Sequence, residues 1–560
     1  MDGQYKPLSL FAWFERRLDS GPQSWKEYLF SLLIFNTLLF VFSYVVLALQ
    51  PWLPLNPDGK TLLAPSAIFN SVASFMTNTD LQHYAGDQHL SNFSQIFFGI
   101  TNLFISAAIG LCALTAIIRA LRSDAHVGNF FVDLWRVIIY LFVPIAFIFA
   151  IIFMQQGTPM TFKSVYPVMT LEQTKQEIVL GPVAAFEAMK MLGTNGGGFY
   201  GMNSAHPFEN PTALSNFFNT LAMMIFPFAL VLMYGRMLRQ IRHSTVIYIV
   251  MLIFMAGTVI WTIHYDTEKP NPGLTAHAEK TYSIPNLKAP VIVPAVSALP
   301  LDQHLGNLEG KEMRFGTSAG ATFAALTTDV TCGAVNAEGD SLNPLAALSP
   351  MVGMWLNCIF GGKGVGMINM LMFVIMGIFL AGMMVGRTPE YLGKKIGVRE
   401  VKLAIIGLLI HPFMILLPAG LFAATVWGMH AISNPAAHGF SQSLYQFSSA
   451  SANNGSAFDG LQVTYGFWNN PNPAPEAVYW DIATGLVMIL SRFMPMIAMV
   501  AMAAFLGQKK SSPFGMGTLR VDTITFGVLL LGTIIIVGAL LFLPVAVLGP
   551  LAEHLGPMPF

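Results

Sequence analysis

Nine long apolar runs, separated by polar joins, form the main pattern of the sequence. A run of about 20 apolar residues is long enough to cross the hydrocarbon core of a bilayer as a helix. The runs cover residues 28–50, 94–121, 133–154, 215–237, 244–264, 366–386, 401–427, 479–506 and 521–547. The pattern therefore predicts an all-α polytopic membrane protein with nine spanning helices.

Two kinds of join alternate along the chain, and the short ones are basic. They follow the second, fourth, sixth and eighth runs, and Lys and Arg in short loops mark the cytoplasmic side of a membrane. Their basic residues are Arg119, Arg122, Arg136, Arg236, Arg239, Arg242, Arg387, Lys394, Lys395, Arg399, Lys402, Lys509, Lys510 and Arg520. The N-terminal segment is basic too, with Lys6, Arg16, Arg17 and Lys26. We therefore expect a cytoplasmic N-terminus and, after nine spans, an external C-terminus.

The first 27 residues are polar to amphipathic rather than continuously apolar. The apolar side chains that precede Glu15, Arg16 and Arg17 are Leu8, Leu10, Phe11, Trp13 and Phe14. A helix with one apolar and one charged face lies in the plane of the membrane interface. The segment is predicted to be such an interfacial helix, and a disordered start is the alternative.

Each of the other four joins is long and contains a short apolar run followed by small polar residues. The short runs, at 65–76, 181–192, 317–328 and 441–451, are too short to cross a membrane as helices. The polar segments follow at 76–80, 193–199, 331–335 and 452–456. Irregular backbone survives at membrane depth only where protein buries it or water lines it. These joins therefore predict four re-entrant helices, each ending in a polar segment.

The unit of span, re-entrant helix, polar segment and span occurs four times in the same direction. Parallel repeats of this kind place their shared element on a common axis, here a pseudo-fourfold axis. We interpret residues 28–121, 133–237, 244–386 and 401–506 as the four repeats, preceded by 1–27 and followed by a ninth span at 521–547. The stretches at 265–316 and 460–478 are predicted to be external excursions.

The polar segments have the residues that an ion filter needs. In such a filter, free carbonyl groups replace the hydration shell of a cation, and the ends of the re-entrant helices offer partial negative charge. Glycine and asparagine best tolerate the irregular backbone, and here they are Asn78, Asn195, Gly196, Gly333, Asn454 and Gly455. Because no ring of carboxylates is shared, a monovalent cation suits the site better than a divalent one. One such loop alone indicates only a turn; four in matching joins favour a filter.

Composition excludes several other classes of protein. The chain is 54% hydrophobic and 10% charged, whereas soluble domains are about 25% charged. Its net charge of zero gives no basis for nucleic-acid binding. The three cysteines form no metal-binding or disulfide pattern. No nucleotide-binding or phosphorylation motif is present and no soluble domain is large enough to hold nucleotide. The energy for uphill transport must therefore come from an ion gradient or another subunit.

Two further features lie within or beside predicted spans. Arg492 is inside the eighth span, where a charge is costly and usually faces a cavity or a partner; an Arg that reaches the interface is the alternative. The sequence GGKGVG at 361–366 interrupts the approach to the sixth span with four glycines and one cation. A flexible gate below the filter and a plain external turn explain Gly361, Gly362, Lys363 and Gly364 equally well.

Several stretches resemble the potassium-binding, channel-like subunit of the bacterial Kdp potassium-transporting ATPase. They are MLGTNGGGF at 191–199, HPFENPT at 206–212, GRTPEYLGKK at 386–395, SFMTNT at 74–79 and ANNGSAF at 452–458. The resemblance runs from about Trp25 to the last span. Other members of the potassium-transporter superfamily share the fourfold repeat without these sequences.

The resemblance implies a non-catalytic subunit that selects external K⁺ in the bacterial inner membrane, binds no nucleotide itself, and delivers the ion to a P-type subunit that hydrolyses ATP. It also implies a small single-span subunit and surrounding lipid. The implied filter residues are Asn78, Thr79, Gln82, Thr194, Asn195, Gly196, Thr331, Cys332, Gly333, Asn453, Asn454 and Gly455. Arg492 and the break at 361–366 match the family's intramembrane Arg and gating element.

The sequence departs from the family pattern at its start. The usual pattern begins with one more span, giving ten, and residues 1–27 do not replace it. The four repeats are intact, so we expect selectivity to survive. A gradient-coupled or channel-like K⁺/Na⁺ transporter subunit of the same superfamily is the alternative function, and the sequences of the second repeat and of 386–395 favour the ATP-driven complex.

Overall fold

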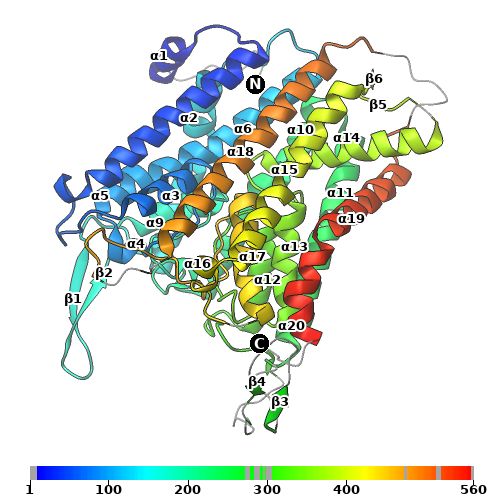
Figure 1. Ribbon diagram of the computed structural model, residues 1–560. Helices are drawn as coiled ribbons and strands as arrows, with labels where there is room; N and C mark the ends of the chain where they lie inside the picture. The colour runs from blue at the N-terminus through cyan, green and yellow to red at the C-terminus, as the bar shows by residue number, and fades with distance from the viewer. Residues whose placement is uncertain are drawn as a thin grey trace.

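The computed structural model is almost entirely helical (Figure 1). It describes residues 9–271, 305–386, 388–434, 436–471, 476–511 and 519–555, together with 278–282, 291–293, 295, 297 and 474. Lys6, Leu8, Arg387 and parts of the predicted excursions at 265–316 and 460–478 lie outside the described residues.

Nine helices in the described ranges are long and apolar enough to cross a membrane, as the sequence predicts. Three of them continue through a wider turn, so that two labels share one span. They are α2 (Trp25–Ala48), α5 to α6 (Asn92–Leu121), α7 to α8 (Phe130–Gln156), α10 (Ala213–Met237), α11 with its last turn (Ile241–Thr267), α14 (Val365–Val385), α15 (Val398–Ala423), α18 (Ala477–Gly507) and α19 to α20 (Ile524–Leu555). The predicted ends are within eight residues of these.

Four short helices occupy the long joins, where the sequence predicts re-entrant helices. They are α3 (Pro65–Met76), α9 (Val183–Leu192), α12 (Thr317–Asp329) and α17 (Ala436–Ala452). Pro65 begins α3 at a position whose N–H has no helical acceptor in any case. In Figure 1 the four helices lie toward the end of the molecule that carries the β1–β2 hairpin. Each one ends where its polar segment begins.

The sequence did not predict one apolar helix and three small hairpins. Helix α13 (Pro344–Leu356) begins at Pro344 and ends at Asn357, whose φ of +46° is left-handed. The hairpin of β1 (Val165–Met169) and β2 (Lys175–Val179) pairs Val165 with Val179 and projects from the molecule (Figure 1). Smaller hairpins join β3 (Lys280–Tyr282) to β4 (Val291–Val293) and β5 (Glu390–Tyr391) to β6 (Lys394–Lys395).

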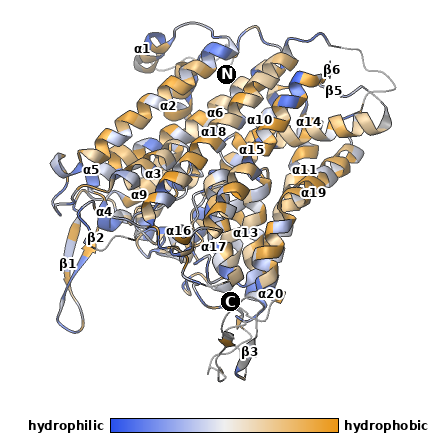
Figure 2. Ribbon diagram, viewed as in Figure 1, coloured by the Kyte–Doolittle hydropathy of each residue, from blue (hydrophilic) through white to orange (hydrophobic). Residues whose placement is uncertain are grey.

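The second and eighth spans form the centre of the bundle. In their most apolar windows, 78% and 67% of the residues are buried, against 22% in the third span. Helix α18 packs against α3, α6 and α15. The outer spans present apolar surface (Figure 2), such as Leu540 on α19, which is 76% exposed. Such surface fits a lipid environment, in which apolar side chains need no burial in protein.

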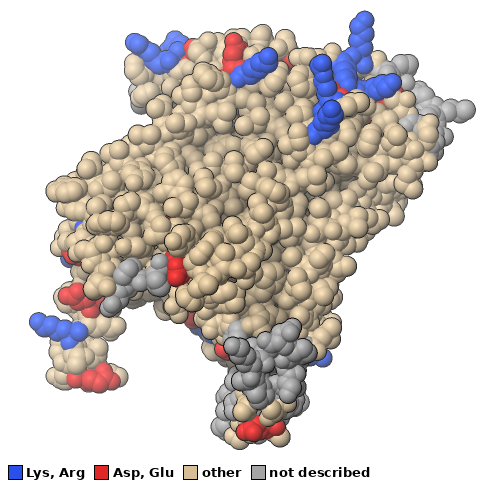
Figure 3. Space-filling view, in the orientation of Figure 1, with Lys and Arg blue, Asp and Glu red and all other residues tan. Residues whose placement is uncertain are grey.

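The two ends of the molecule differ in charge (Figure 3). On the face shown, Lys and Arg gather at the end that carries α1 (Ser9–Leu18) and the β5–β6 hairpin, and Asp and Glu are more frequent at the other end. A helix is thus present where the sequence predicts an interfacial one. It packs beside α7, where Phe14 stacks on Trp135 with ring centroids 5.1 Å apart. Glu15 also pairs with Arg136 at 2.8 Å.

Candidate functional site

The four polar segments contain the same backbone turn. In each, the first residue has a left-handed φ, and the N–H of the next residue donates to the carbonyl oxygen five residues earlier. The left-handed residues are Asn78 (+61°), Thr194 (+42°), Thr331 (+47°) and Asn453 (+53°). The hydrogen bonds are Thr79 to Ser74 (3.0 Å), Asn195 to Lys190 (3.1 Å), Cys332 to Thr327 (2.7 Å) and Asn454 to Ser449 (3.0 Å). The segments are therefore equivalent residue by residue.

The third equivalent position reveals a residue that sequence reasoning left out of the site. Its φ is again left-handed, at Asp80 (+52°), Gly196 (+91°), Gly333 (+82°) and Gly455 (+102°). Three segments use glycine, for which this backbone carries no steric cost, but the first uses Asp80. The signal that could have found it is its place two residues after Asn78, as Gly196 stands two residues after Thr194.

Carbonyl oxygens from all four segments lie close to one another. A Cβ added to Gly196 would lie 2.7 Å from the oxygen of Cys332, 2.9 Å from that of Asn454 and 3.0 Å from that of Thr79. A Cβ on Gly455 would lie 3.1 Å from the oxygen of Asn195 and would also meet that of Thr79. We call the oxygens of Thr79, Asn195, Cys332 and Asn454 the carbonyl ring. Such a ring can replace the hydration shell of a cation.

The asparagine side chains join neighbouring segments to each other. The Asn78 amide donates to the carbonyl of Thr194 at 2.9 Å, and its side-chain oxygen accepts from the Asn195 amide at 2.9 Å. The Asn453 amide donates to the Thr79 hydroxyl at 2.9 Å, and the Asn454 amide donates to the carbonyl of Thr327 at 3.1 Å. All four side chains therefore make contacts between repeats, and Asn78 and Asn453 have a left-handed φ as well.

Gln82 lies beside the second segment rather than on the carbonyl ring. Its amide donates to the carbonyl of Gly198 at 2.9 Å, and its oxygen accepts from the N–H of Gly198 at 2.9 Å. The side chain therefore pairs with both backbone groups of one residue. This contact connects the first and second repeats just beyond the ring.

An open cavity of about 420 Å³ adjoins the segments at Gly197 and Gly455. Its lining includes Gln82, Asp87, Gly197, His206, Gly455 and Asp459. Burial raises the pKa of the Asp459 carboxyl to about 7, and the nearby carboxylate of Glu338 adds to the shift. Burial lowers the pKa of His206, whose ring stacks on Tyr200 at 3.8 Å. The cavity thus places several ionisable groups, among them Asp87, His206 and Asp459, on the side of the segments where Gly197 and Gly455 lie.

The glycine-rich break at 361–366 packs against the beginning of the third segment. The N–H groups of Gly361 and Gly362 donate to the carbonyls of Asp329 (3.1 Å) and Val330 (2.6 Å). A Cβ on Gly362 would lie 2.8 Å from the Thr331 hydroxyl oxygen. Residues 357–364 are all buried, so the break is not an exposed turn.

Two buried cations lie beside this break. Lys363 is 2% exposed, its Nζ has no hydrogen-bond partner among the described residues, and it lies 4.8 Å from the centroid of the Phe226 ring. Arg492, which is 5% exposed, donates to the carbonyl of Ser106 at 3.3 Å. Gly110 on α6 adjoins both, since a Cβ there would meet the Lys363 carbonyl and the Arg492 guanidinium.

The described residues contain no group of three or more His, Cys, Asp or Glu side chains that could hold a metal ion. The described segments instead bring together backbone carbonyls and amide side chains, with the single buried carboxylate of Asp80 in the first segment. All twelve predicted filter residues are in or next to the segments, and eleven of them form the equivalent positions, with Gln82 as the exception.

Comparison with known proteins places the chain among potassium-transporting ATPase subunits. The family described as "KdpA: Potassium-transporting ATPase A subunit" matches residues 9–555. A relative from Geobacillus kaustophilus is 43% identical over 536 residues, which are 95% of this chain and 89% of the relative. One from Caldanaerobacter subterraneus subsp. tengcongensis is 41% identical over 532 residues, with the same coverage. Both are called "Potassium-transporting ATPase potassium-binding subunit".

A solved structure has a similar fold at low sequence identity. The potassium transporter TrkH from Vibrio parahaemolyticus superposes with a TM-score of 0.51 at 11% identity. The match covers 86% of this chain and 85% of TrkH. This likeness concerns the fold, whereas the family match spans nearly the whole sequence. The chain therefore belongs to the family of potassium-transporting ATPase A subunits.

Proposed function

We propose that this chain is the potassium-binding subunit of an ATP-driven K⁺ uptake complex. The observation that carries the proposal is the carbonyl ring, to which each of four equivalent segments contributes one oxygen. Neutral carbonyl oxygens, held by hydrogen bonds within and between segments, suit a monovalent cation that gives up its water readily. The names of the two relatives agree with this role.

The proposed path of the ion runs from the outer cavity through the carbonyl ring to the break at 361–366. The cavity collects cations, and the ring removes their water and selects K⁺. Gly361, Gly362, Lys363 and Gly364 form a gate beneath the ring, next to Arg492. Support for this order comes from the contacts, because the cavity adjoins Gly197 and Gly455 and the break adjoins Thr331.

The proposed partners are a P-type subunit that hydrolyses ATP and a small single-span subunit in the bacterial inner membrane. The motifs at 191–199, 206–212 and 386–395 support this assembly. The basic end of the molecule is assigned to the cytoplasm by the positive-inside rule. The cavity end then faces outward, which fits uptake.

Co-purification tests this function. The chain is expressed with its neighbouring genes, isolated by a tag, and assayed for ATP hydrolysis in K⁺ and in Na⁺. We expect a co-purified ATPase whose rate rises with K⁺ and not with Na⁺. A chain that conducts K⁺ without any ATP-hydrolysing partner would contradict the proposal and favour a channel-like transporter.

A further inference from the structure

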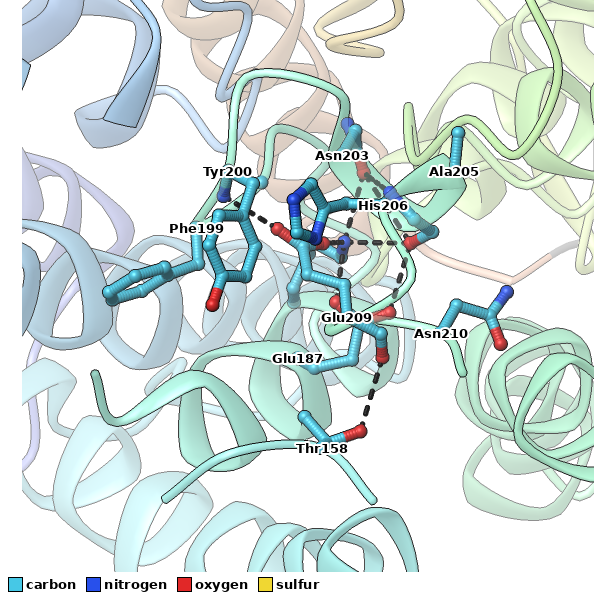
Figure 4. Close-up of polar contacts among 12 residues, drawn as sticks. Thr158, Glu187, Phe199, Tyr200, Asn203, Ala205, His206, Glu209 and Asn210 are labelled. Carbon is cyan, nitrogen blue, oxygen red and sulfur yellow. Dashed lines mark hydrogen bonds and ion pairs between the residues drawn. The ribbon is translucent and has the colours of Figure 1, made fainter. Parts of the chain in front are cut away.

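A buried charged cluster lies directly behind the second polar segment. Lys190, in the last turn of α9, is fully buried, as are Glu187 and Glu209. The Lys190 Nζ lies 2.5 Å from Glu187 Oε2 and 2.7 Å from Glu209 Oε2. It also donates to the hydroxyl of Ser204 at 2.8 Å. Figure 4 shows the two carboxylates pointing into this common centre.

Lys190 holds two parts of the chain at once. Its carbonyl oxygen accepts the N–H of Asn195, which is the hydrogen bond that defines the turn of the second segment. Its ammonium binds the loop that returns after that segment, through Asn203 at 2.9 Å and Glu209. One residue therefore connects the inner start of the segment to the loop beyond its outer end.

Glu209 fixes the outer end of the same segment. Its Oε1 accepts the N–H of Tyr200 at 2.8 Å, while its Oε2 accepts from Lys190. A Cβ on Gly198 would lie 2.8 Å from Glu209 Oε1, so this backbone sits close against the carboxylate. Gln82 holds Gly198 from the other side. The segment is thus clamped between the first repeat and the charged cluster.

This arrangement is specific to the second segment. The residues equivalent to Lys190, whose carbonyls make the same hydrogen bond, are the uncharged Ser74, Thr327 and Ser449. Burying charges carries a large desolvation cost, which close ion pairs and hydrogen bonds offset. Here the ammonium has four oxygen neighbours within 2.9 Å, of which Glu187 Oε2 is an ion-pair partner without a hydrogen bond. A rigid cluster behind the second segment therefore holds one side of the carbonyl ring in a fixed position.

We propose that Lys190, together with Glu187 and Glu209, is a positioning group that sets the place of the Asn195 carbonyl and thereby the ion selectivity of the carbonyl ring. This inference rests on the proposed function. The cluster touches no ion itself; it acts by holding both ends of the second segment. Loosening it lets the ring adapt to a smaller cation, so discrimination against Na⁺ falls before turnover does.

The test uses the whole complex and the double variant K190M/E209Q. This variant removes one positive and one negative charge, so the cluster keeps its net charge while the link between segment and loop is lost. We expect the K⁺ concentration for half-maximal ATP hydrolysis to rise at least tenfold and Na⁺ to begin to stimulate, with the maximal rate within about threefold of wild type. The variant Glu187→Gln, which leaves Glu209 in place, should show a smaller change in the same direction.

The matched control is Lys311→Met. Lys311 and Asp266 form another buried pair, 3.0 Å apart, that lies outside the polar segments. Its loss should lower stability without changing the K⁺/Na⁺ ratio. An unchanged ratio in K190M/E209Q overturns the positioning role, as does an equal loss of selectivity in both variants. A wild-type complex without any response to K⁺ would instead reject the proposed function.

Discussion

Adding one methyl group at Gly196 tests the carbonyl ring most sharply. The Cβ of Gly196→Ala would lie between 2.7 and 3.0 Å from three ring oxygens, those of Cys332, Asn454 and Thr79. It would therefore occupy space that a cation shares with those oxygens. We expect K⁺ binding to weaken strongly. Membrane insertion should be unaffected, because Gly196 lies outside the spanning helices.

The magnitude follows from the contacts of the added methyl group with the ring oxygens. Overpacking against rigid neighbours costs about 1–3 kcal/mol, and we expect this cost to appear in K⁺ binding. Because about 1.4 kcal/mol corresponds to a tenfold change, the half-maximal K⁺ concentration should rise at least about fivefold. Alanine at a φ of +91° adds a strain of about 1–2 kcal/mol, which lowers stability with or without the ion. The assay is ATP hydrolysis by the purified complex over a K⁺ titration.

Gly21→Ala is the matched control for backbone strain. Gly21 has a φ of +90°, and no atom lies within 4 Å of its added Cβ. It shares the strain of Gly196→Ala without the contacts to the ring, so its K⁺ titration should match that of the wild type. A half-maximal K⁺ concentration within threefold of wild type for Gly196→Ala, or an equal shift in both variants, would rule out an ion site at the carbonyl ring. Gly196→Asp, which puts a carboxylate in the ion path, should abolish high-affinity uptake altogether.

Three other variants test the surroundings of the ring. Asp459 ionises near pH 7 in the outer cavity, so apparent K⁺ affinity should fall as external pH drops from 8 to 6, and Asp459→Asn should flatten this profile; a flat wild-type profile would exclude the effect. Lys363→Met removes a buried ammonium without a hydrogen-bond partner among the described residues. It should therefore raise the Tm of the complex, and a lower Tm would show that the charge is stabilised. Gln82→Arg breaks both hydrogen bonds to Gly198 and adds a cation at the cavity, so the half-maximal K⁺ concentration should rise; an unchanged value would argue against this role.

The spans and the short helices could be predicted because hydrophobic length is a strong local signal. All nine predicted spans and the four short helices are present in the described ranges. Helix α13 was not predicted from the sequence, because its 13 residues are too few to suggest a span and include Pro344, Ser349 and Pro350. Its position depends on packing against α11 and α12, which local sequence does not encode.

The equivalence of the four segments was only partly visible in the sequence. The backbone turn is the same, but its third position is glycine in three segments and aspartate in the first, so no single letter pattern aligns them. The role of Lys190 was not predicted for a different reason, since a lysine within a short apolar helix does not indicate which residues it pairs with. Glu209 lies 19 residues later in the chain, and only the fold brings the two together.

The location of a bound cation would show whether the carbonyl ring is the ion-binding site. Rb⁺ is a heavier substitute for K⁺ that can be located by anomalous diffraction from crystals of the complex. We expect a peak among the carbonyl oxygens of Thr79, Asn195, Cys332 and Asn454, which disappears in the Gly196→Asp complex. A peak elsewhere in the chain with none at the ring, or a ring peak that persists in Gly196→Asp, would contradict this expectation.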